Sequence, residues 1–402
     1  MYIGMDIHKK FIQIVYIENA SGPVKESFKI AATYDSITEY AKRLKPEDNV
    51  VLESTIQTVP VVDLLKKSGA NVVISNPMRT KMIADSKIKS DKVDAEALAR
   101  LLACGYIPPV WQPTEEIGKL RAIVSTASSL INHRIIIKNR IHSILQRNLV
   151  DYNKIPELFN GTGRKFLEEV ILPEEEKFQM DLEIQLLDEV EKRIKIITKI
   201  IACRVIKDEE AKRIMSIPGI DFYTALALKS AIGDISRFDN PKKLVSYFGL
   251  NPRIYQSANS CFGGPISKRG RSYARWVIVQ AAKHAARTPG PLRAFFKRIK
   301  RRSVNNKAVV AVANKVTRII WHMLTKKTEY RCAHPLRTKE KMDRLRIIAT
   351  GVRLKTGMKA GVYKGGRPAY LEARKHDHDN AKKLEKEYMK SVRKRIDPSK
   401  SK

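Results

Sequence analysis

The sequence predicts an α/β fold at its amino end and an all-α fold over most of the remainder. Residues 1 to about 105 alternate short β-rich runs with segments of helical spacing, as in a mixed sheet flanked by helices. From about Thr114 to Glu209 the spacing of apolar residues is helical almost throughout. The Pro-rich segment Gly105 to Pro113 lies between these regions and is expected to be a linker. A chain of 402 residues is long enough for two or three domains.

The first region is expected to open with a β-hairpin. Its β-rich runs Tyr2 to Met5 and Phe11 to Ile17 are joined by a short polar turn, and Ser27 to Ile30 adds a third strand. Asn49 to Glu53 contains the continuous apolar run of a buried strand. The other expected elements are helices over Ile37 to Leu44, Val59 to Lys67 and Asp91 to Cys104, and a strand over Ala70 to Ser75.

The long helical region contains a seam of apolar residues that step by three and four. The seam consists of Leu187, Val190, Ile194, Ile197 and Ile201, with charged residues between them. Such a seam predicts an antiparallel coiled coil or a dimer arm. An amphipathic helix packed on its own domain has the same pattern, and this alternative stays open because the regular run is only two heptads long.

A second globular region is expected between Ser216 and about Lys327. Helices over Thr224 to Ile232 and Pro241 to Phe248, with a Gly-containing turn, resemble a helix-hairpin-helix, whose amides bind DNA phosphate without reading sequence. An ordinary helical turn fits the same pattern. The segment from Arg331 onward holds 22 Lys or Arg and 8 Asp or Glu, and it is expected to be a partly disordered arm on nucleic acid or to hold a short helix over Ala381 to Arg395. The predicted division of the chain is 1–108, 109–209, 210–328 and 329–402.

Charge is the strongest indication of a binding partner. The net charge is +35, and the block 240–328 carries 20 Lys or Arg without one Asp or Glu. Clustered positive charge of this kind concentrates phosphate polymers at a protein surface, so nucleic acid is the expected partner. A merely well-solvated basic protein is the alternative, which clustering disfavours.

Cysteine usage and hydropathy indicate a cytoplasmic protein. The four cysteines are far apart and form no CxxC pair, which suits a reducing compartment without structural zinc. The first residues lack the apolar run of a signal peptide. No apolar stretch approaches the roughly 20 residues that a membrane-spanning helix needs, so no membrane partner is expected.

Four carboxylates are spaced so that they can form one acidic site. Asp6 ends the first expected strand, and Glu53 ends the strand Asn49 to Glu53. Asp91 and Asp94 are three residues apart on one helix, which puts their Cβ atoms about 5–6 Å apart. Such a group becomes tolerable when a divalent cation neutralises it, and Mg²⁺ prefers oxygen ligands. Alternatively, each residue has a separate structural role, such as capping a turn, pairing with a lysine or complementing a helix dipole.

Six short motifs, in order, resemble the DEDD transposases of insertion sequences. They are Tyr-Ile-Gly-Met-Asp6, Leu-Glu53-Ser-Thr, Asn76-Pro77 with Ser-Asp91-Lys-Val-Asp94-Ala, Ser216-Ile-Pro-Gly-Ile220, Phe248-Gly-Leu-Asn-Pro-Arg253 and Ile266-Ser-Lys-Arg-Gly270. The group they resemble is the IS-one-ten group, which includes Piv-type DNA invertases. The resemblance covers about residues 1 to 325. Each motif alone is weak, but their order over both halves of the chain is specific.

The resemblance implies a fold and a reaction. It implies a RuvC-like, RNase H-type domain that holds Mg²⁺ at Asp6, Glu53, Asp91 and Asp94, a coiled-coil linker, and a helical transposase domain. It also implies that Ser257, which follows Pro252-Arg-Ile-Tyr-Gln, recombines DNA through a covalent phosphoserine. Members of the group are prokaryotic, use a structured bridge RNA that pairs with donor and target DNA, and act as dimers that assemble into tetramers. This chain departs from the group at Ile56 and Ala258, where Gly is common, and in its length beyond Arg331.

Further residues are expected to assist. Ser260 is the alternative nucleophile, and Ser267 and Ser272 follow it. Cations near Ser257 and in the tract Arg293 to Arg302 are expected to hold nucleic-acid phosphates, although any one of them also fits a solvated face. Phe295 and Phe296 either stack on bases or belong to the core. The expected phosphate contacts are Arg253, Lys268, Arg269, Arg271, Arg275, Lys297, Arg298 and Arg301.

Other functions fit parts of the sequence. A RuvC-like Holliday-junction nuclease uses activated water and needs the four carboxylates but not Ser257. A non-enzymatic nucleic-acid-binding protein needs only the basic half. A decayed copy of a transposase is a further alternative, although an intact set of four carboxylates disfavours it.

Overall fold

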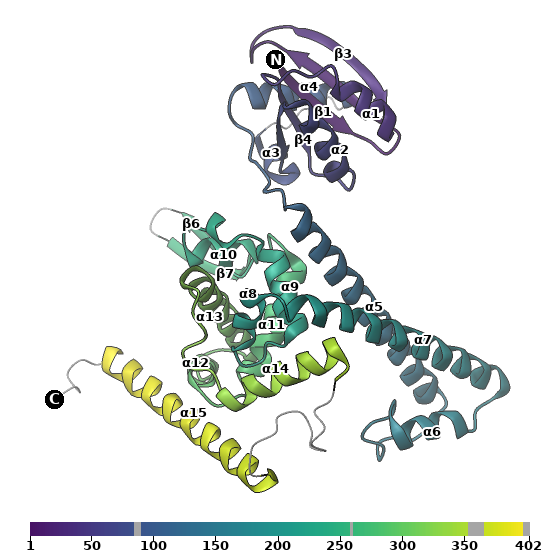
Figure 1. Ribbon diagram of the computed structural model, residues 1–402, viewed down its shortest axis with the longest axis vertical. Coiled ribbons are helices and arrows are strands. Elements are labelled where there is room, and N and C mark those ends of the chain that lie inside the picture. The colour runs from purple at the N-terminus through teal and green to yellow at the C-terminus, as the bar shows by residue number, and fades with distance from the viewer. Residues whose placement is uncertain (84–89, 258–259, 353–365, 397–402) are drawn as a thin grey trace. The chain divides into compact units, whose positions relative to one another are not determined.

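The computed structural model describes the chain except for residues 84–89, 258–259, 353–365 and 397–402 (Figure 1). The side chains of residues 257, 261, 366–367 and 393–396 also lie outside the described part. The chain forms two compact units, Met1–Thr114 and Glu115–Lys402. No helix among the described residues is long and apolar enough to cross a membrane.

The amino-terminal unit is a mixed five-stranded sheet with helices, as the sequence predicts. The strand order is β3-β2-β1-β4-β5. β2 pairs antiparallel with β1 and with β3, whereas β4 runs parallel to β1 and β5. The elements are β1 (Tyr2–Ile7), β2 (Phe11–Ile17), β3 (Val24–Ala31), α1 (Tyr34–Ala41), β4 (Asn49–Glu53), α2 (Thr58–Leu65), η1 (Lys66–Ser68), β5 (Asn71–Ser75), α3 (Pro77–Ile83) and α4 (Asp91–Ala103).

The sheet of this unit buries both of its faces. Side chains alternate along β1, so Ile3 and Met5 point to the face that α1 and α2 cover. The opposite face of β2, with Val15 and Ile17, packs against Ala95 and Ala99 of α4. This two-sided burial explains why β1, β2 and β4 are apolar almost throughout, and it fixes α4 across the sheet.

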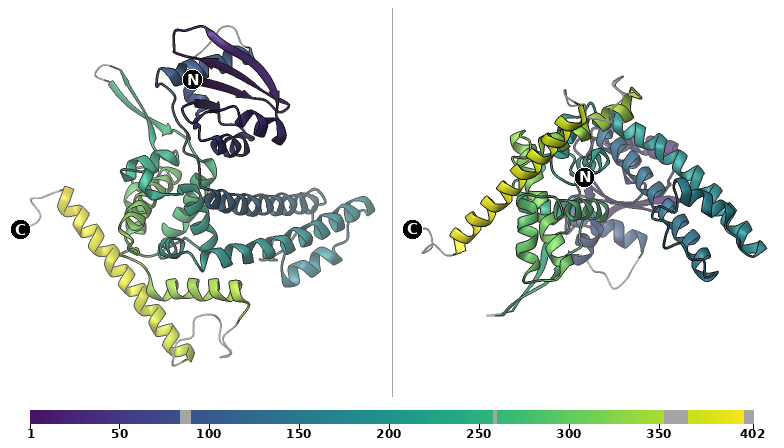
Figure 2. Two further views of the ribbon diagram at one scale, coloured as in Figure 1. Left: turned by 45° about the horizontal axis from the view of Figure 1, so that its top comes forward. Right: turned by 90° about the horizontal axis from the view of Figure 1, so that it is seen from below.

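The second unit consists mainly of helices, again as predicted. Its elements are α5 (Glu115–Arg147), α6 (Gly161–Glu169), α7 (Glu174–Val205), α8 (Glu209–Met215), α9 (Phe222–Ile232), η2 (Ile235–Arg237), α10 (Pro241–Tyr247), β6 (Pro252–Ser257), β7 (Ser260–Ile266), α11 (Ser272–Ala285), α12 (Pro291–Lys300), α13 (Asn305–Lys326), α14 (Pro335–Thr350) and α15 (Gly366–Ile396). Figure 2 shows how these helices gather within the unit.

The long helices α5 and α7 form an antiparallel pair. Ion pairs join Lys138 to Glu191 and Arg147 to Glu176, so residue numbers rise along α5 as they fall along α7. Leu187 and Val190 of the predicted seam are buried between them. Ile201, at the other end of the seam, belongs instead to the core formed by α8 to α13. The antiparallel coiled coil is therefore intramolecular, and the dimer arm stays a prediction.

The Gly-containing turn between α8 and α9 is held inside the second unit. Gly219 adopts a positive φ of 86°, and a Cβ on it would lie 2.5 Å from the carbonyl oxygen of Ala281 in α11. Lys341 of α14 donates hydrogen bonds to the carbonyl oxygens of Met215 and Ile217, at 2.7 and 2.9 Å. This turn precedes α9. The helices of the expected helix-hairpin-helix are α9 and α10, which are joined through Gly233, with a positive φ of 65°, and η2.

Two parts of the second unit differ from expectation. Strands β6 and β7 form an antiparallel hairpin within a region for which the sequence predicts helices. The hairpin lacks the Asn-Gly or Asp-Gly turn that marks such structures in a sequence. In addition, the described part of the segment after residue 329 folds into α14 and α15, which pack on the rest of the unit, and α15 contains the expected helix over Ala381 to Arg395 within a longer one. Buried Leu336 and Leu345 of α14 account for its docking.

Candidate functional site

Two carboxylates lie at the ends of neighbouring parallel strands. Met5 of β1 pairs with Leu52 of β4, so Asp6 and Glu53 follow at the same level of the sheet. Both side chains point to the face that α4 covers, because they alternate with Met5 and Leu52, which lie in the core on the other face. Strand register alone therefore brings Asp6 and Glu53 to one edge.

Helix α4 brings the other two carboxylates to the same edge. A Cβ added to Gly4 would lie 1.8 Å from the carbonyl oxygen of Ala95, so α4 approaches β1 more closely than any side chain would allow. Ser90 caps the helix by accepting a hydrogen bond from the Val93 amide at 3.3 Å. Asp91 and Asp94 occupy the first turn, where the helix dipole favours negative charge.

A histidine absent from the predicted site belongs to this acidic cluster. His8 follows β1 directly, and its Nε2 lies 2.9 Å from Oδ2 of Asp6 and 3.1 Å from Oδ1 of Asp91. One potential ligand atom from each of these three residues lies within 4.8 Å of the others. The position of His8, two residues after Asp6 in the sequence, was the available signal. Lys29 of β3 also pairs with Asp91, at 3.0 Å.

Electrostatic interactions within the acidic cluster shift the pKa of several of its carboxylates. Burial raises the pKa of Asp6, and Asp94 and Asp91 add to the rise, while His8 opposes it. Burial also raises the pKa of Glu53, with further increases from Asp6 and Asp94. Asp91 behaves differently, since the hydrogen bond from Lys29 lowers its pKa. Burial and the neighbouring carboxylates thus disfavour the ionised forms of Asp6 and Glu53.

The donor atoms of this cluster fit a hard divalent cation. Carboxylate oxygens are the ligands that Mg²⁺ prefers, and the cluster supplies them from β1, β4 and α4. A cation there would also remove the repulsion that raises the pKa of Asp6 and Glu53. Because the Nε2 of His8 lies between Asp6 and Asp91, a cation that binds both oxygens competes with this imidazole.

The expected nucleophile lies at the tip of the β6–β7 hairpin. The backbone of Ser257 pairs with that of Ser260, and residues 258–259 between them lie outside the described residues, as does the side chain of Ser257. Ser260 is exposed. Ser267 donates its backbone N–H to the carbonyl of Asn251 at 2.7 Å, and Ser272 begins α11. Among the described parts of these serines, Ser257 and Ser260 share the hairpin tip.

Several of the expected phosphate contacts have partners within the protein. Arg275 donates to the carbonyl oxygens of Phe248 and Lys268, both at 3.1 Å, and so holds the loop before α11. Arg271 donates to the hydroxyl of Tyr247 at 2.9 Å. Lys268 and Arg269 are exposed on this loop, and Arg253 is exposed on β6. Lys268, Arg269 and Arg253 are therefore the most accessible members of this group.

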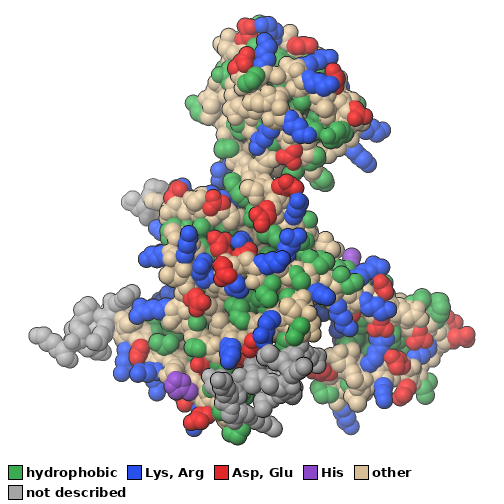
Figure 3. Space-filling model, viewed as in Figure 1, with side chains coloured by type: hydrophobic (Ala, Val, Ile, Leu, Met, Phe, Trp, Pro, Cys, Tyr) green, Lys and Arg blue, Asp and Glu red, His purple; other side chains and the backbone are tan. Residues whose placement is uncertain are grey.

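The basic helix α12 is partly covered. Lys297 pairs with Glu385 of α15 at 3.2 Å, and Arg298 lies 5.2 Å from the ring centre of Phe295. Phe295 and Phe296 pack partly buried against the core of the unit, which favours the core interpretation over base stacking. Arg301, just after α12, is exposed. Figure 3 shows Lys and Arg side chains over much of the visible surface of the second unit, among fewer acidic ones.

The mixed sheet with its helices is consistent with a DEDD transposase domain, and comparisons with known proteins bear out this class of protein. A family model for that domain, described as a transposase, matches residues 3–149. A second model, described as the transposase IS116/IS110/IS902 family, matches residues 211–297. The chain therefore belongs to the IS116/IS110/IS902 family of insertion-sequence transposases.

Individual relatives agree with the family. The chain is 28% identical, over 66% of its length and 74% of the relative, to the transposase for insertion sequence element IS1111A of Coxiella burnetii. It is 25% identical to a probable family 20 transposase of Pseudomonas aeruginosa, over 82% of this chain and 98% of the relative. It is also 28% identical to the pilin gene-inverting protein of Moraxella bovis, over 63% of this chain and 72% of the relative.

Proposed function

We propose that this transposase cuts and rejoins DNA through a covalent bond to Ser257, with Mg²⁺ held by Asp6, Glu53, Asp91 and Asp94. One observation carries the proposal: three separate elements bring four carboxylates to one edge of the sheet, where burial and mutual repulsion raise the pKa of Asp6 and Glu53. Carboxylates whose pKa is raised by burial and by one another are typical of functional clusters rather than of ordinary surface acids.

The carboxylates and the serine have distinct roles. When bound, Mg²⁺ supplies a positive charge that polarises the phosphate and favours an ionised serine. Glu53 or Asp6, with a raised pKa, is better suited than an ordinary carboxylate to accept a proton at the site. The exposed cations Lys268, Arg269 and Arg253 position phosphates of the DNA backbone.

The bonds in the proposed reaction balance without ATP. The Oγ of Ser257 attacks a DNA phosphorus, an Oγ–P bond forms, and the P–O3′ bond breaks. The proton of the serine hydroxyl passes to a carboxylate, and the departing 3′ oxygen takes up a proton. The phosphoserine ester conserves the energy of the broken bond, so a second DNA 3′ hydroxyl can reverse the step and join a new strand.

The proposal extends to partners. A structured bridge RNA that pairs with donor and target DNA would supply sequence specificity, and the large excess of Lys and Arg in the second unit supports binding of both polymers. Assembly of a homodimer, and of a tetramer from two dimers, is supported by an apolar stripe on α7. Phe178, Leu182 and Leu186 recur every four residues there, and their side chains are 67%, 50% and 46% exposed.

Trapping the covalent intermediate tests the proposal. Wild-type protein incubated with element-end DNA, its RNA and Mg²⁺ is expected to give a protein–DNA adduct on a denaturing gel. Ser257→Ala is expected to abolish the adduct and recombination while DNA binding persists, and Ser260→Ala is the matched control at the same hairpin tip. An adduct that survives Ser257→Ala and disappears in Ser260→Ala would move the role to Ser260.

Cleavage without any adduct would favour the junction nuclease instead. That enzyme needs the carboxylates and a water molecule, so Asp6→Asn would stop cleavage while Ser257→Ala would not. DNA and RNA binding with no cleavage in any protein preparation would favour the non-enzymatic alternative.

A further inference from the structure

The extension that begins at Arg331 is strongly basic, and its helix α15 uses acidic residues for contacts with the rest of the unit. Residues 331–402 carry 22 Lys or Arg against 8 Asp or Glu. Of these acids, Glu385 and Asp377 lie on the side of α15 that packs on the rest of the unit. The exposed cations of α15 outnumber its exposed acids Glu372, Asp379 and Glu387, and docking does not account for them.

Glu385 anchors α15 to α12. Its Oε2 accepts hydrogen bonds from Nε and an Nη of Arg293, at 2.9 and 2.6 Å, and from the amide of Gly290 at 3.3 Å. Its Oε1 lies 3.2 Å from Nζ of Lys297, and the side chain is only 12% exposed. Burial alone would raise the pKa of Glu385, but the bonds from Arg293, Lys297 and Gly290 outweigh burial and lower it. The helix is thus fixed in one orientation by an ionised, largely buried carboxylate.

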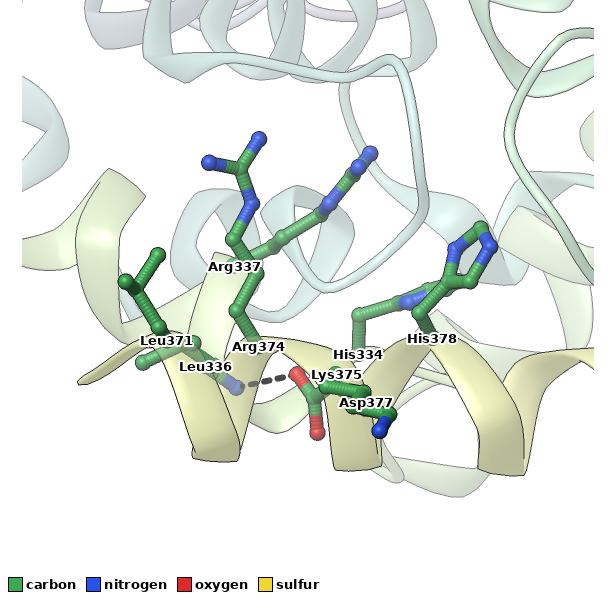
Figure 4. Close-up of a pocket in the computed structure, with 8 residues that line it drawn as sticks. All are labelled: His334, Leu336, Arg337, Leu371, Arg374, Lys375, Asp377 and His378. Carbon is green, nitrogen blue, oxygen red and sulfur yellow. Dashed lines mark hydrogen bonds between the residues drawn. The ribbon is translucent and has the colours of Figure 1, made fainter. Parts of the chain in front are cut away.

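A cationic pocket lies where α15 meets the start of α14. Its volume is about 380 Å³, and its lining is His334, Leu336, Arg337, Leu371, Arg374, Lys375, Asp377 and His378. Asp377 accepts the amide of Leu336 at 2.8 Å and so caps α14 (Figure 4). The guanidinium groups of Arg337 and Arg374 extend to the same side of α15, away from Asp377. Within the described residues, no carboxylate forms an ion pair with Arg337, Arg374 or Lys375.

A row of lysines continues from this pocket along α15. Lys382, Lys386 and Lys390 are exposed and recur every four residues, a spacing of about 6 Å along the helix. The other side of this part of α15 is occupied by Ala381, which is buried, and by Tyr388, over whose ring Lys315 of α13 lies at 5.5 Å. Lys375 lies on the same face, so the outward cations extend from Lys375 to Lys390 over about 22 Å of helix, with the exposed Asp379 among them.

Two roles for a docked C-terminal helix are physically distinct. A helix that blocks the basic surface of α12 would mimic nucleic acid and carry excess negative charge. A helix that extends this surface would carry excess positive charge. Because the extension has 22 basic and 8 acidic residues, the second role fits. The docking through Glu385 neutralises two cations of α12 but presents a larger number on α15.

We propose that the Arg337–Arg374–Lys375 pocket and the Lys382–Lys386–Lys390 row form a binding surface for the phosphate backbone of duplex DNA. This inference rests on the proposed function in so far as the transposase must hold DNA. The surface is sequence-independent, since lysine and arginine contacts to phosphate fix position without reading bases.

Duplex rather than single-stranded nucleic acid suits this surface. Single strands bind grooves in which aromatic side chains stack on bases. The tyrosines of α15 are used inside the protein: the hydroxyl of Tyr370 donates to Glu340 at 2.6 Å, and Tyr388 lies under Lys315. A long helix with lysines at every fourth residue matches instead the regular backbone of a double helix, which carries a charge about every 1.7 Å along its axis.

The experiment measures how the affinity of the full-length protein for a short duplex of arbitrary sequence depends on salt. One variant combines Lys382→Gln, Lys386→Gln and Lys390→Gln. The matched control removes the same charge from exposed lysines of α7, by Lys192→Gln, Lys195→Gln and Lys199→Gln. Fluorescence anisotropy gives the slope of log K against log salt, whose magnitude falls by about 0.9 for each phosphate that the protein no longer neutralises. Circular dichroism and the melting temperature check that each variant is folded.

The α15 variant is expected to lower the magnitude of the slope by about 2.7 if each of the three lysines neutralises one phosphate, and the control by much less. A second triple variant, Arg337→Gln with Arg374→Gln and Lys375→Gln, is expected to behave like the first. Equal slopes for both α15 variants and the α7 control would overturn the inference. So would a weakening confined to a structured RNA probe with duplex DNA binding unchanged.

Glu385→Ala provides an independent test of the inference. Releasing the anchor is expected to weaken duplex binding, because the cations of α15 are no longer fixed on one surface. Tighter binding by Glu385→Ala would mean that α15 covers a site on α12, and the inference would be rejected. Failure of the wild-type protein to bind any duplex would count against the proposed function itself, and the two failures are therefore distinguishable.

Discussion

The two units of this transposase distribute charge in opposite ways. Residues 1–114 hold 15 Lys or Arg against 13 Asp or Glu, whereas residues 115–402 hold 62 against 29. Almost all of the net charge of +35 therefore belongs to the second unit. The first unit is nearly neutral but concentrates four acids at one edge of its sheet. Chemistry needs a few charges in fixed positions, which strand ends provide, while binding of a polymer needs many charges spread over helices.

The largest expected effect comes from a substitution at the acidic edge, which leaves the second unit unchanged. Asp6→Asn removes one ligand from the cation site, and a loss of roughly 4 kcal/mol of transition-state stabilisation would slow recombination about a thousandfold. Strand-exchange assays measure the rate, and anisotropy measures DNA binding, which is expected to change little. Loss of DNA binding in parallel with activity would contradict the separation of roles between the units.

A glycine substitution should have opposite effects in the two units. Gly4→Ala places a Cβ 1.8 Å from the carbonyl oxygen of Ala95 and pushes α4 from the sheet, at a cost of about 3 kcal/mol. Gly118→Ala in α5 meets nothing within 4 Å and is expected to stabilise the helix by about 1 kcal/mol. Calorimetric melting of each variant tests both. A neutral Gly4→Ala would mean that α4 does not pack against β1 as described.

Magnesium should stabilise only the unit that holds the acids. At a concentration one hundred times its Kd, a ligand that binds the folded state alone adds about 2.7 kcal/mol. We expect the melting transition of the first unit to rise with added Mg²⁺ and that of the second to stay constant. Asp6→Asn is the control and should abolish the rise. A uniform response of both transitions would indicate a general ionic effect.

A further expected effect is an opposite response of the metal-free units to rising pH. The raised pKa of Asp6 and Glu53 means that the folded first unit binds more protons, so its stability falls as pH rises from the ordinary carboxyl range through these pKa values. In the second unit, burial lowers the pKa of Lys341 to about 8, so stability rises from about pH 8 toward the ordinary pKa of lysine. Asp6→Asn and Lys341→Met should flatten the respective curves.

Much of the first unit could be predicted from local sequence, because its strands are buried on both faces. Continuous apolar runs such as Val50 to Leu52 identify such strands, and a carboxylate directly after the run identifies the edge. Gly4, which has no Cβ, is in keeping with the close approach of α4. His8 was not predicted, since its position two residues after Asp6 indicates only that it lies near Asp6, and its second contact depends on where α4 places Asp91.

The second unit was harder to predict in detail. The β6–β7 hairpin that carries Ser257 lacks a diagnostic turn, so the sequence predicts a mainly helical domain without it. The seam from Leu187 to Ile201 predicts the helix correctly but not its partner, because α5 and a second copy of the chain satisfy the same apolar pattern. Docking of α15 depends on Glu385 meeting Arg293, which lies far away in sequence.

Lys341 has a practical consequence for shortening this protein. Its amine crosses from α14 to the backbone between α8 and α9, where it satisfies the carbonyl oxygens of Met215 and Ile217. A truncation before Pro335 would leave these two carbonyl oxygens without their hydrogen-bond donor. It would also expose the apolar side chains that pack against buried Leu345. A stop codon after Thr350 deletes α15 but keeps Lys341 and its two hydrogen bonds. It therefore tests the contribution of α15 without disturbing the interior of the second unit.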